Sequence, residues 1–333
     1  MKLFRPFTIA AMMALVAGCG QAVQPPAASS FLPQTRPEAN HASPHDSWMS
    51  GDAKSEDLLY VSNGNAEVTV YEYWRHKLLG VLTSLSQPKG ICVDKSQNVY
   101  IADYAGQQIV EFAHGGTKPI AKFDDAPDSP YSCWVDPTSG NLAVANYDSS
   151  QSGNIAIWSN GNRVTYGDSK IGGFQFCAYD DHGTLLATNG YAQYPYTSSF
   201  AWLPKNGTKL VDVNLPGPYG WTWGELEGLD WDGLYFVLDT GDRLYRESLS
   251  HGQAYYVGYT STSASDWYQS GPHGFYTPAG ASRATQVFEG MRFEGSGAYE
   301  VAFWKYPAGG SSPIATLKHG LDAPFGVAVS LKH

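Results

Sequence analysis

Two residues in the second half of the chain, Glu227 and His273, carry the side chains that acid–base chemistry requires. A carboxylate and an imidazole held close together can exchange a proton with a substrate or share a divalent cation such as Ca²⁺. No second carboxylate is convincingly placed beside them, and the motifs GxSxG and HExxH and the P-loop are missing. We therefore favour a protein without catalysis or cofactor, and keep Glu227 and His273 as the alternative catalytic or metal-binding pair.

A second group of candidate functional residues consists of aromatic residues. They lie in long segments that lack the alternation of apolar and polar residues typical of strands. Flat rings exposed in loops suit stacking on sugars or contact with a protein partner, although rings can also pack beneath their own loops. We take these rings as the candidate ligand-binding residues: Tyr194, Tyr196, Tyr219, Trp221, Trp223 and Trp267.

Three cysteines lie in the body of the chain, at positions 92, 133 and 177. Cys133 and Cys177 occupy the same position of a repeated segment, and Cys92 lies one position later. Cys92 and Cys133 could meet if their side chains face each other, but three small buried hydrophobic residues are the interpretation we favour. No CxxC pair is present, which argues against a structural zinc site.

The elements that must position these residues are revealed by an internal repeat. Segments similar to Gln87–Asp94 (QPKGICVD) recur along the chain, and their matching positions are 42 to 52 residues apart. Each copy except the last is followed by a second predicted strand, such as Asn98–Asp103, and then by a third and a fourth. Four strands in each such period predict a β-propeller. The matching positions are Gly90, Ser132, Phe176, Gly228, Gly274 and Gly326.

The two ends of the repeat region complement each other. The ordered part begins with three strands, Leu58–Asn63, Val68–Tyr73 and Leu78–Leu82, which have no first strand of their own. A lone first strand, Gly326–Ser330, lies near the end of the sequence. The sequence therefore predicts an all-β, six-bladed propeller with four strands per blade, closed by this C-terminal innermost strand joining the three N-terminal ones.

In such a ring, the residues that precede or begin the first strands line a central funnel: Lys89, Tyr131, Gln175, Glu227, His273 and Phe325. Polar residues at the ends of the second strands, such as Asn63, Asp103 and Asp239, resemble a ring of ligands. Their repetition is better explained by turn formation. Asp94, Asp136, Asp180 and Asp232 are likewise expected to form turns, on the opposite face.

Several motifs resemble the NHL-repeat six-bladed propellers, and more closely a group of uncharacterised bacterial lipoproteins that carry such repeats. The motifs are PKGICVDKSQNVYIADY, QIVEFAHGGTKPIAKF, DPTSGNLAVANYD and FWKYPAGGSSPIATL. The resemblance covers about residues 48–333 and implies the fold, but not a function. It also suggests the alternative activity, a metal-dependent gluconolactonase-like hydrolase or a propeller lyase with Glu227 and His273 at its centre.

The N-terminus has the features of an export signal, with basic residues, a short apolar stretch and small residues before Cys19. LVAGC resembles a bacterial lipobox, which implies removal of residues 1–18 and lipidation of Cys19. Residues 19–55 then form a flexible tether rich in Pro, Ala and Ser, and residues 56–333 form the propeller. We expect an extracytoplasmic, lipid-anchored protein, at the outer membrane or cell surface.

Composition agrees with this assignment. The 333 residues include 36 Gly and 14% aromatic residues but only 16% charged ones, as expected for short strands and tight turns. The net charge of −10 argues against a nucleic-acid partner. We therefore expect a membrane-anchored binding or scaffold module. It would bind a protein or carbohydrate ligand on its funnel face, the face of the ring at which the central funnel opens.

Overall fold

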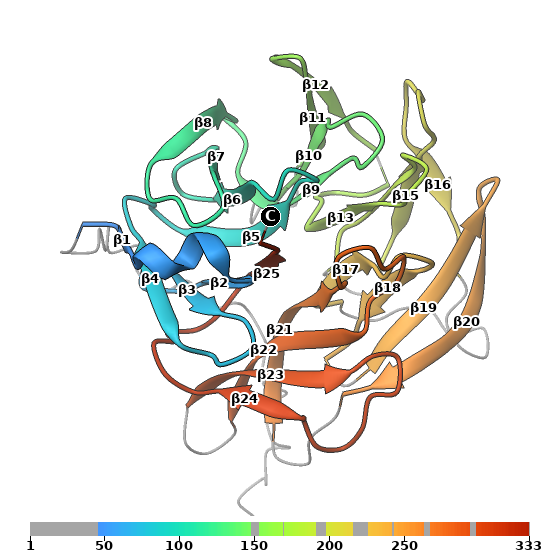
Figure 1. The fold of residues 1–333 in the computed structure, drawn as a ribbon. Coiled ribbons are helices and arrows are strands. Elements are labelled where there is room, and N and C mark those ends of the chain that lie inside the picture. The colour runs from blue at the N-terminus through green and yellow to red at the C-terminus, as the bar shows by residue number, and fades with distance from the viewer. Residues whose placement is uncertain are drawn as a thin grey trace, which may run out of the picture. The chain divides into compact units, whose positions relative to one another are not determined.

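The computed structural model describes residues 46–147, 153–168, 170–190, 198–215, 226–241, 243–262, 267–293 and 298–332, with only the backbone for 267–272 and 291–293. These residues form six antiparallel sheets that are arranged as blades around one centre (Figure 1). In five of the sheets the strands follow one another in chain order from the axis outward, and in the remaining sheet the last strand of the chain is innermost and the first is outermost. The prediction of an all-β, six-bladed propeller with four strands per blade is confirmed.

The first three blades contain the N-terminal half of the described chain and, in blade 1, the last strand as well. Blade 1 comprises β25 (Val327–Ser330), β2 (Leu58–Ser62), β3 (Val68–Glu72), β4 (Leu78–Leu82) and β1 (Trp48–Met49). Blade 2 comprises β5 (Pro88–Val93), β6 (Val99–Asp103), β7 (Gln108–Phe112) and β8 (Pro119–Asp124). Blade 3 comprises β9 (Pro130–Val135), β10 (Leu142–Asn146), β11 (Ile155–Ser159) and β12 (Asn162–Tyr166).

The remaining three blades follow the same pattern. Blade 4 comprises β13 (Phe176–Tyr179), β14 (Leu185–Thr188), β15 (Phe200–Leu203) and β16 (Val211–Val213). Blade 5 comprises β17 (Gly228–Trp231), β18 (Phe236–Asp239), β19 (Arg243–Ser250) and β20 (Gln253–Ser261). Blade 6 comprises β21 (Trp267–Tyr276), β22 (Gln286–Phe293), β23 (Tyr299–Lys305) and β24 (Ala315–Leu317).

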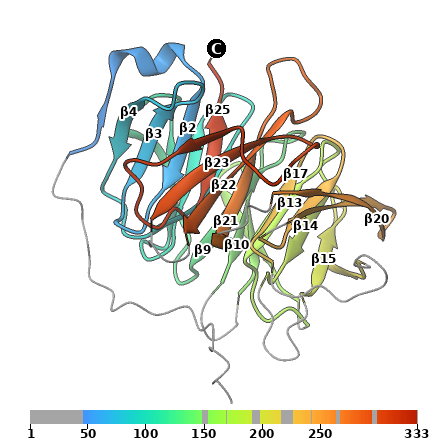
Figure 2. The same cartoon turned by 90° about the horizontal axis from the view of Figure 1, so that it is seen from below.

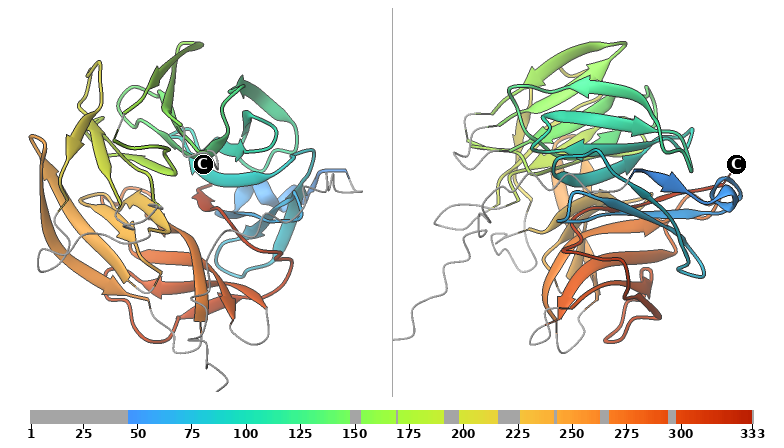
Figure 3. Two further views of the ribbon diagram at one scale, coloured as in Figure 1. Left: turned by 180° about the vertical axis from the view of Figure 1, so that it is seen from behind. Right: turned by 90° about the vertical axis from the view of Figure 1, so that its left-hand side faces the viewer.

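The ring is closed within blade 1. Strand β25 pairs with β2, so that Val327 lies opposite Val61 and Ser330 opposite Leu58 (Figure 2). The same strand also contacts the innermost strands of both neighbouring blades, β5 and β21. The view from behind shows it at the centre of the ring (Figure 3). The predicted closure by a C-terminal innermost strand is therefore confirmed.

The chain packs onto blade 1 before residue 56, where the tether was expected to end. Trp48 and Met49 form a short fifth strand on the outer edge of β4. The 3₁₀ helix η1 (Gly51–Ser55) follows, with Ala53 fully buried. Covering the outer edge of a sheet in this way removes an exposed row of backbone hydrogen-bonding groups.

The hydrophobic core lies between blades. Both faces of strands such as β2 and β6 are buried, because each sheet has a neighbouring sheet on either side. Outer strands such as β8 and β12 are largely exposed or half-buried instead. This gradient explains why the second strands are almost continuously apolar, as strands buried on both faces are.

The repeated polar positions have the structural roles that were expected of them. The Asp103 carboxylate accepts hydrogen bonds from the backbone N–H groups of Ser86 and Gln87, each at 2.8 Å. Asp180, on the opposite face, accepts from the backbone N–H groups of His182 and Thr184. Both carboxylates thus replace backbone acceptors that the connecting turns lack.

A disulfide joins Cys92 of β5 to Cys133 of β9, with Cα atoms 5.7 Å apart. This corrects the favoured interpretation of three separate thiols, although Cys177 does remain a free, buried cysteine. Strands β5 and β9 approach closely enough for the bond because a glycine stands at position 90. A Cβ atom there would lie 2.7 Å from the Cα atom of Ser132.

Removal of the closing strand should abolish cooperative folding. Deleting residues 326–333 removes β25 and leaves the inner edge of β2 unpaired, whereas deleting residues 331–333 keeps the strand. We expect the longer deletion to lose its thermal unfolding transition, measured by circular dichroism, and the shorter one to retain it. A melting curve of the longer deletion that matches the full chain would contradict this account of closure.

Loss of the disulfide should destabilise the ring measurably. The bond closes a loop with a sequence separation of 41 residues, which restricts the unfolded chain. We expect the double variant Cys92→Ala, Cys133→Ala to lose about 2 to 4 kcal/mol of unfolding free energy in urea titrations. A reducing agent should destabilise the unmodified chain similarly and leave the double variant unchanged. An equal effect of the reducing agent on both proteins would show that it acts elsewhere.

Candidate functional site

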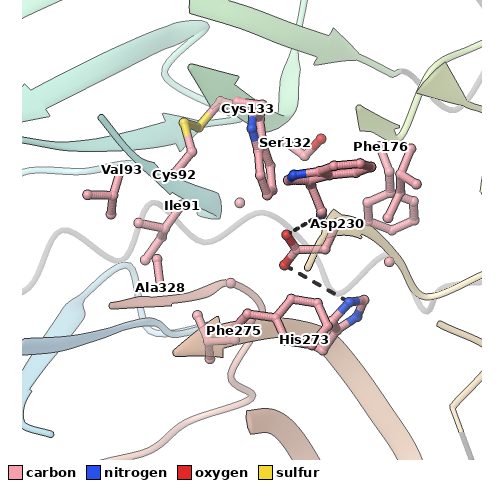
Figure 4. Close-up of a pocket in the computed structure, with 18 of the residues that line it drawn as sticks. Ile91, Cys92, Val93, Ser132, Cys133, Phe176, Asp230, His273, Phe275 and Ala328 are labelled. Carbon is pink, nitrogen blue, oxygen red and sulfur yellow. Dashed lines mark hydrogen bonds and ion pairs between the residues drawn. A yellow bond between two sulfur atoms is a disulfide. The ribbon is translucent and has the colours of Figure 1, made fainter. Parts of the chain in front are cut away.

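A cavity of about 240 Å³ lies where the six innermost strands converge (Figure 4). Its walls are mostly apolar, with Ile91, Leu229, Phe275 and Val327 among the lining residues. The matching positions of the sequence repeat all line it as well: Gly90, Ser132, Phe176, Gly228, Gly274 and Gly326. The repeat thus marks the residues that surround the axis, and the small side chains at most of these positions leave the central space open.

His273 of β21 is the polar centre of this cavity. Its side chain is fully buried, and its Nδ1 atom lies 3.2 Å from Oδ2 of Asp239, at the end of β18 in the neighbouring blade. Its other ring nitrogen, Nε2, is buried without a hydrogen-bond partner in the described part of the chain. Burial lowers the pKa of His273, but the hydrogen bond and charge of Asp239 and the charge of Asp230 outweigh it, so the pKa is raised overall.

Asp230 of β17 faces the same imidazole (Figure 4). Its Oδ2 atom lies 4.0 Å from Nε2 of His273, too far for a direct hydrogen bond. Burial raises the pKa of Asp230 to about 7, against the opposing effect of His273. Buried acids and bases whose pKa values are shifted toward neutrality are typical of functional sites.

Sequence reasoning did not identify Asp230, although a signal was present. In the aligned repeat, its position is held by Cys92, Trp134 and Ala178 in other blades, so Asp230 is a carboxylate where the pattern otherwise has uncharged residues. Asp239 was interpreted as a turn residue. It does accept a hydrogen bond from the backbone N–H of Gly241, but it also holds His273.

A second polar group lies where the innermost strands begin. The Lys89 amine is surrounded by aromatic rings and lies 3.8 Å from the ring centre of Phe325, 5.4 Å from that of Tyr131 and 5.8 Å from that of Tyr104. We call these three rings the aromatic collar. Tyr131 and Phe325 also line the central cavity, so the collar forms part of its wall.

The charge of Lys89 has no acidic partner in the described residues. Contacts between an ammonium group and aromatic faces are worth about 0.5 to 2 kcal/mol each, which does not replace lost hydration. Burial accordingly lowers the pKa of Lys89 to about 8. A partly buried amine without a carboxylate beside it is able to receive an anionic group from a ligand.

The opposite end of the cavity is bounded by two indole rings. Trp134 and Trp231 line both the central cavity and a second hollow of about 330 Å³ beyond it. Asp94, Asp136 and Lys95 line the second hollow, where the first strands end. The two spaces therefore differ in character, one being mainly apolar and the other bordered by charged turns.

Several of the predicted funnel residues lie together. Lys89, Tyr131 and Phe325 form the collar region, and His273 lines the cavity. Glu227 directly precedes β17, and its backbone N–H donates to the carbonyl of Asp239. The pairing of Glu227 with His273 stays a prediction, since the imidazole contacts described above are with Asp239 and Asp230.

The predicted ligand-binding rings fall largely outside the described residues. This applies to Tyr194, Tyr196, Tyr219, Trp221 and Trp223, and also to the lipidation site, Cys19. Trp267 begins β21, but only its backbone is described. These assignments remain predictions.

The described residues contain neither a cluster of metal-binding side chains nor a membrane-spanning helix. No group of three or more His, Cys, Asp and Glu side chains in this part of the chain is arranged to hold a metal ion. The divalent cation of the alternative activity therefore stays a prediction. None of the helices in the described ranges has the length and apolar character needed to cross a bilayer.

Comparison with known proteins supports the fold. A model of the NHL repeat matches residues 85–112, which include β5, β6 and β7. No curated protein sequence matches the chain. A chain of the nidogen/laminin complex superposes with a TM-score of 0.57 at 14% identity, over 83% of this chain and 98% of that one.

A chain of Kuenenia stuttgartiensis hydrazine synthase superposes with a TM-score of 0.55 at 13% identity, over 82% of this chain and 80% of that one. At such low identity, both structures indicate a shared fold and nothing about activity.

The unusual environment of Lys89 should be visible in its reactivity. With its pKa near 8, half of this amine is neutral at that pH, whereas an ordinary lysine with a pKa of 10.5 is almost fully protonated. We expect pulse acetylation of the Lys89 peptide, followed by mass spectrometry from pH 6 to 11, to reach half of its maximum near pH 8. The exposed Lys205 provides the comparison, and a Lys89 midpoint above pH 10 would contradict the burial described here.

Proposed function

We propose that this chain is an exported, lipid-anchored propeller that acts as a binding or scaffold module, with its ligand bound on the funnel face. The observation that carries the proposal is the aromatic collar, in which an amine without an acidic partner stands at the wall of an open central cavity. Burying an amine without a charged partner is unfavourable in a purely structural core, but is useful for recognition.

Export to an oxidising compartment is supported by the Cys92–Cys133 bond. Disulfides are rare in cytosolic proteins and common in secreted and periplasmic ones. The apolar N-terminal stretch that ends in LVAGC, with Cys19 as the lipidation site, agrees with this compartment. In the proposal, lipidated Cys19 anchors the protein at the outer membrane or cell surface.

A protein or carbohydrate ligand agrees with the chemistry of the funnel face. In the proposal, the predicted binding rings Tyr194, Tyr196, Tyr219, Trp221, Trp223 and Trp267 serve the same ligand. Aromatic side chains supply large contact areas at protein interfaces and stack on sugars. The similar fold in the nidogen/laminin complex is an example of a propeller in a protein assembly.

The proposal is tested by comparing aromatic substitutions on different parts of the ring. The full chain would be presented to a glycan array and to immobilised envelope extract, and the retained components quantified. We expect Trp221→Ala and Tyr131→Ala each to weaken binding of the retained component at least tenfold, because both remove a ring from the proposed surface.

The matched control is Tyr255→Ala, which removes a 56% exposed ring from the outermost strand β20. This variant should bind as the unmodified chain does. If the control weakens binding as much as the funnel variants, or if the funnel variants bind normally, the ligand does not lie on the funnel face.

A further inference from the structure

Two polar groups lie at the central cavity: His273 lines its wall, and the Lys89 amine packs against Tyr131 and Phe325, two of the rings that line it. Lys89 is held at the collar, above Tyr131 and Phe325, and His273 faces Asp230 deeper among the apolar residues. A ligand that satisfies both must itself carry two different polar groups on an apolar body. The protein atoms at each of the two positions determine which ligand group can bind there.

At the collar, the protein group available to a ligand is the Lys89 amine. It is a hydrogen-bond donor with no acceptor capacity while charged, and no carboxylate in the described residues pairs with it. An anionic oxygen is its natural partner, since charge-assisted hydrogen bonds are about twice as strong as neutral ones. A carboxylate is such a group, and Lys89 is only half-buried, so its side chain is not fully enclosed by the collar.

At the more deeply buried position, the protein atoms proposed to contact the ligand are Nε2 of His273 and Oδ2 of Asp230. Nε2 is fully buried without a hydrogen-bond partner, and 4.0 Å separates it from the carboxylate oxygen. One hydroxyl oxygen can stand within hydrogen-bonding distance of both atoms, since it accepts from one group and donates to the other. The Nδ1 contact with Asp239 orients the ring for this purpose.

The rest of the cavity wall is mainly apolar. Ile91, Leu229, Phe275 and Val327 line it, and its volume of about 240 Å³ is ample for a ring, since a cavity of roughly 150 Å³ can hold benzene. The edge-to-face contact between Tyr131 and Phe325 adds aromatic surface at the collar. A flat aromatic body would therefore be accommodated.

We propose that the central cavity binds a small aromatic hydroxy acid, with its carboxylate on Lys89 and its hydroxyl group between Asp230 and His273. This inference rests on the proposed binding function and names the chemical class of one ligand. It requires no metal ion and no covalent step.

The test uses 4-hydroxybenzoate and the longer 3-(4-hydroxyphenyl)propanoate as probes, with binding to the full chain measured by calorimetry and ligand-observed NMR. For each acid, the matched amide removes the charge and the matched acid without the hydroxyl group removes the deeper contact. We expect at least one of the two acids to bind at least tenfold more tightly than its amide and at least fivefold more tightly than its counterpart lacking the hydroxyl group.

Two variants assign these preferences to their residues. Lys89→Met keeps the apolar stem but removes the amine, and should abolish the preference for acid over amide while leaving the hydroxyl preference. Asp230→Leu should do the reverse. Lys205→Met, which alters an exposed lysine, should bind as the unmodified chain does. Circular dichroism would confirm that each variant is folded. If a variant does not fold, the ligand preferences of the unmodified protein still test the proposal.

The inference is overturned if both acids bind no better than their amides, or if Lys89→Met retains the acid preference. If the acids fail while Trp221→Ala and Tyr131→Ala still weaken binding of the envelope or glycan partner, only the ligand class is wrong. If both experiments fail, the funnel face is not a binding surface and the broader proposal falls with it.

Discussion

The close approach of six strands around one axis is the constraint on which the rest of this structure depends. The innermost strands meet where a side chain would not fit: a Cβ atom on Gly326 would lie 2.3 Å from the carbonyl oxygen of Lys89, and one on Gly228 would lie 3.0 Å from Nδ1 of His273. Glycine at these positions permits the contact of backbone with backbone and of backbone with ring. The disulfide, the cavity and the placement of the imidazole all follow from this approach.

The architecture was predictable because its signals are local and repeated. A strand, a turn carboxylate such as Asp180, and a second apolar strand recur in four of the six blades, and their spacing indicates the propeller. The lone strand at Val327–Ser330 indicated how the ring closes, since it lacks companions of its own. The short strand Trp48–Met49 is not part of the sequence repeat. It pairs with the outer edge of β4, a contact that the repeat does not indicate.

The candidate site was predictable only in part, because its contacts join residues from different blades. Residues that begin the first strands could be assigned to the funnel, and Lys89, Tyr131 and Phe325 do lie together. Whether His273 contacts Glu227 or an aspartate depends on side-chain directions set by strand twist, which no spacing in the sequence encodes. The bond between Cys92 and Cys133 depends on the same inter-blade geometry.

The position of the closing strand has a consequence for the order in which the molecule is made. Strand β25 is synthesised after every other strand of the ring, yet it is the innermost strand of the blade that is synthesised first. Blade 1 therefore stays incomplete during translation and, in an exported chain, during passage through the translocation channel. The finished ring can form only after the whole repeat region has emerged, so chaperones that protect the exposed edge of β2 would act before that moment.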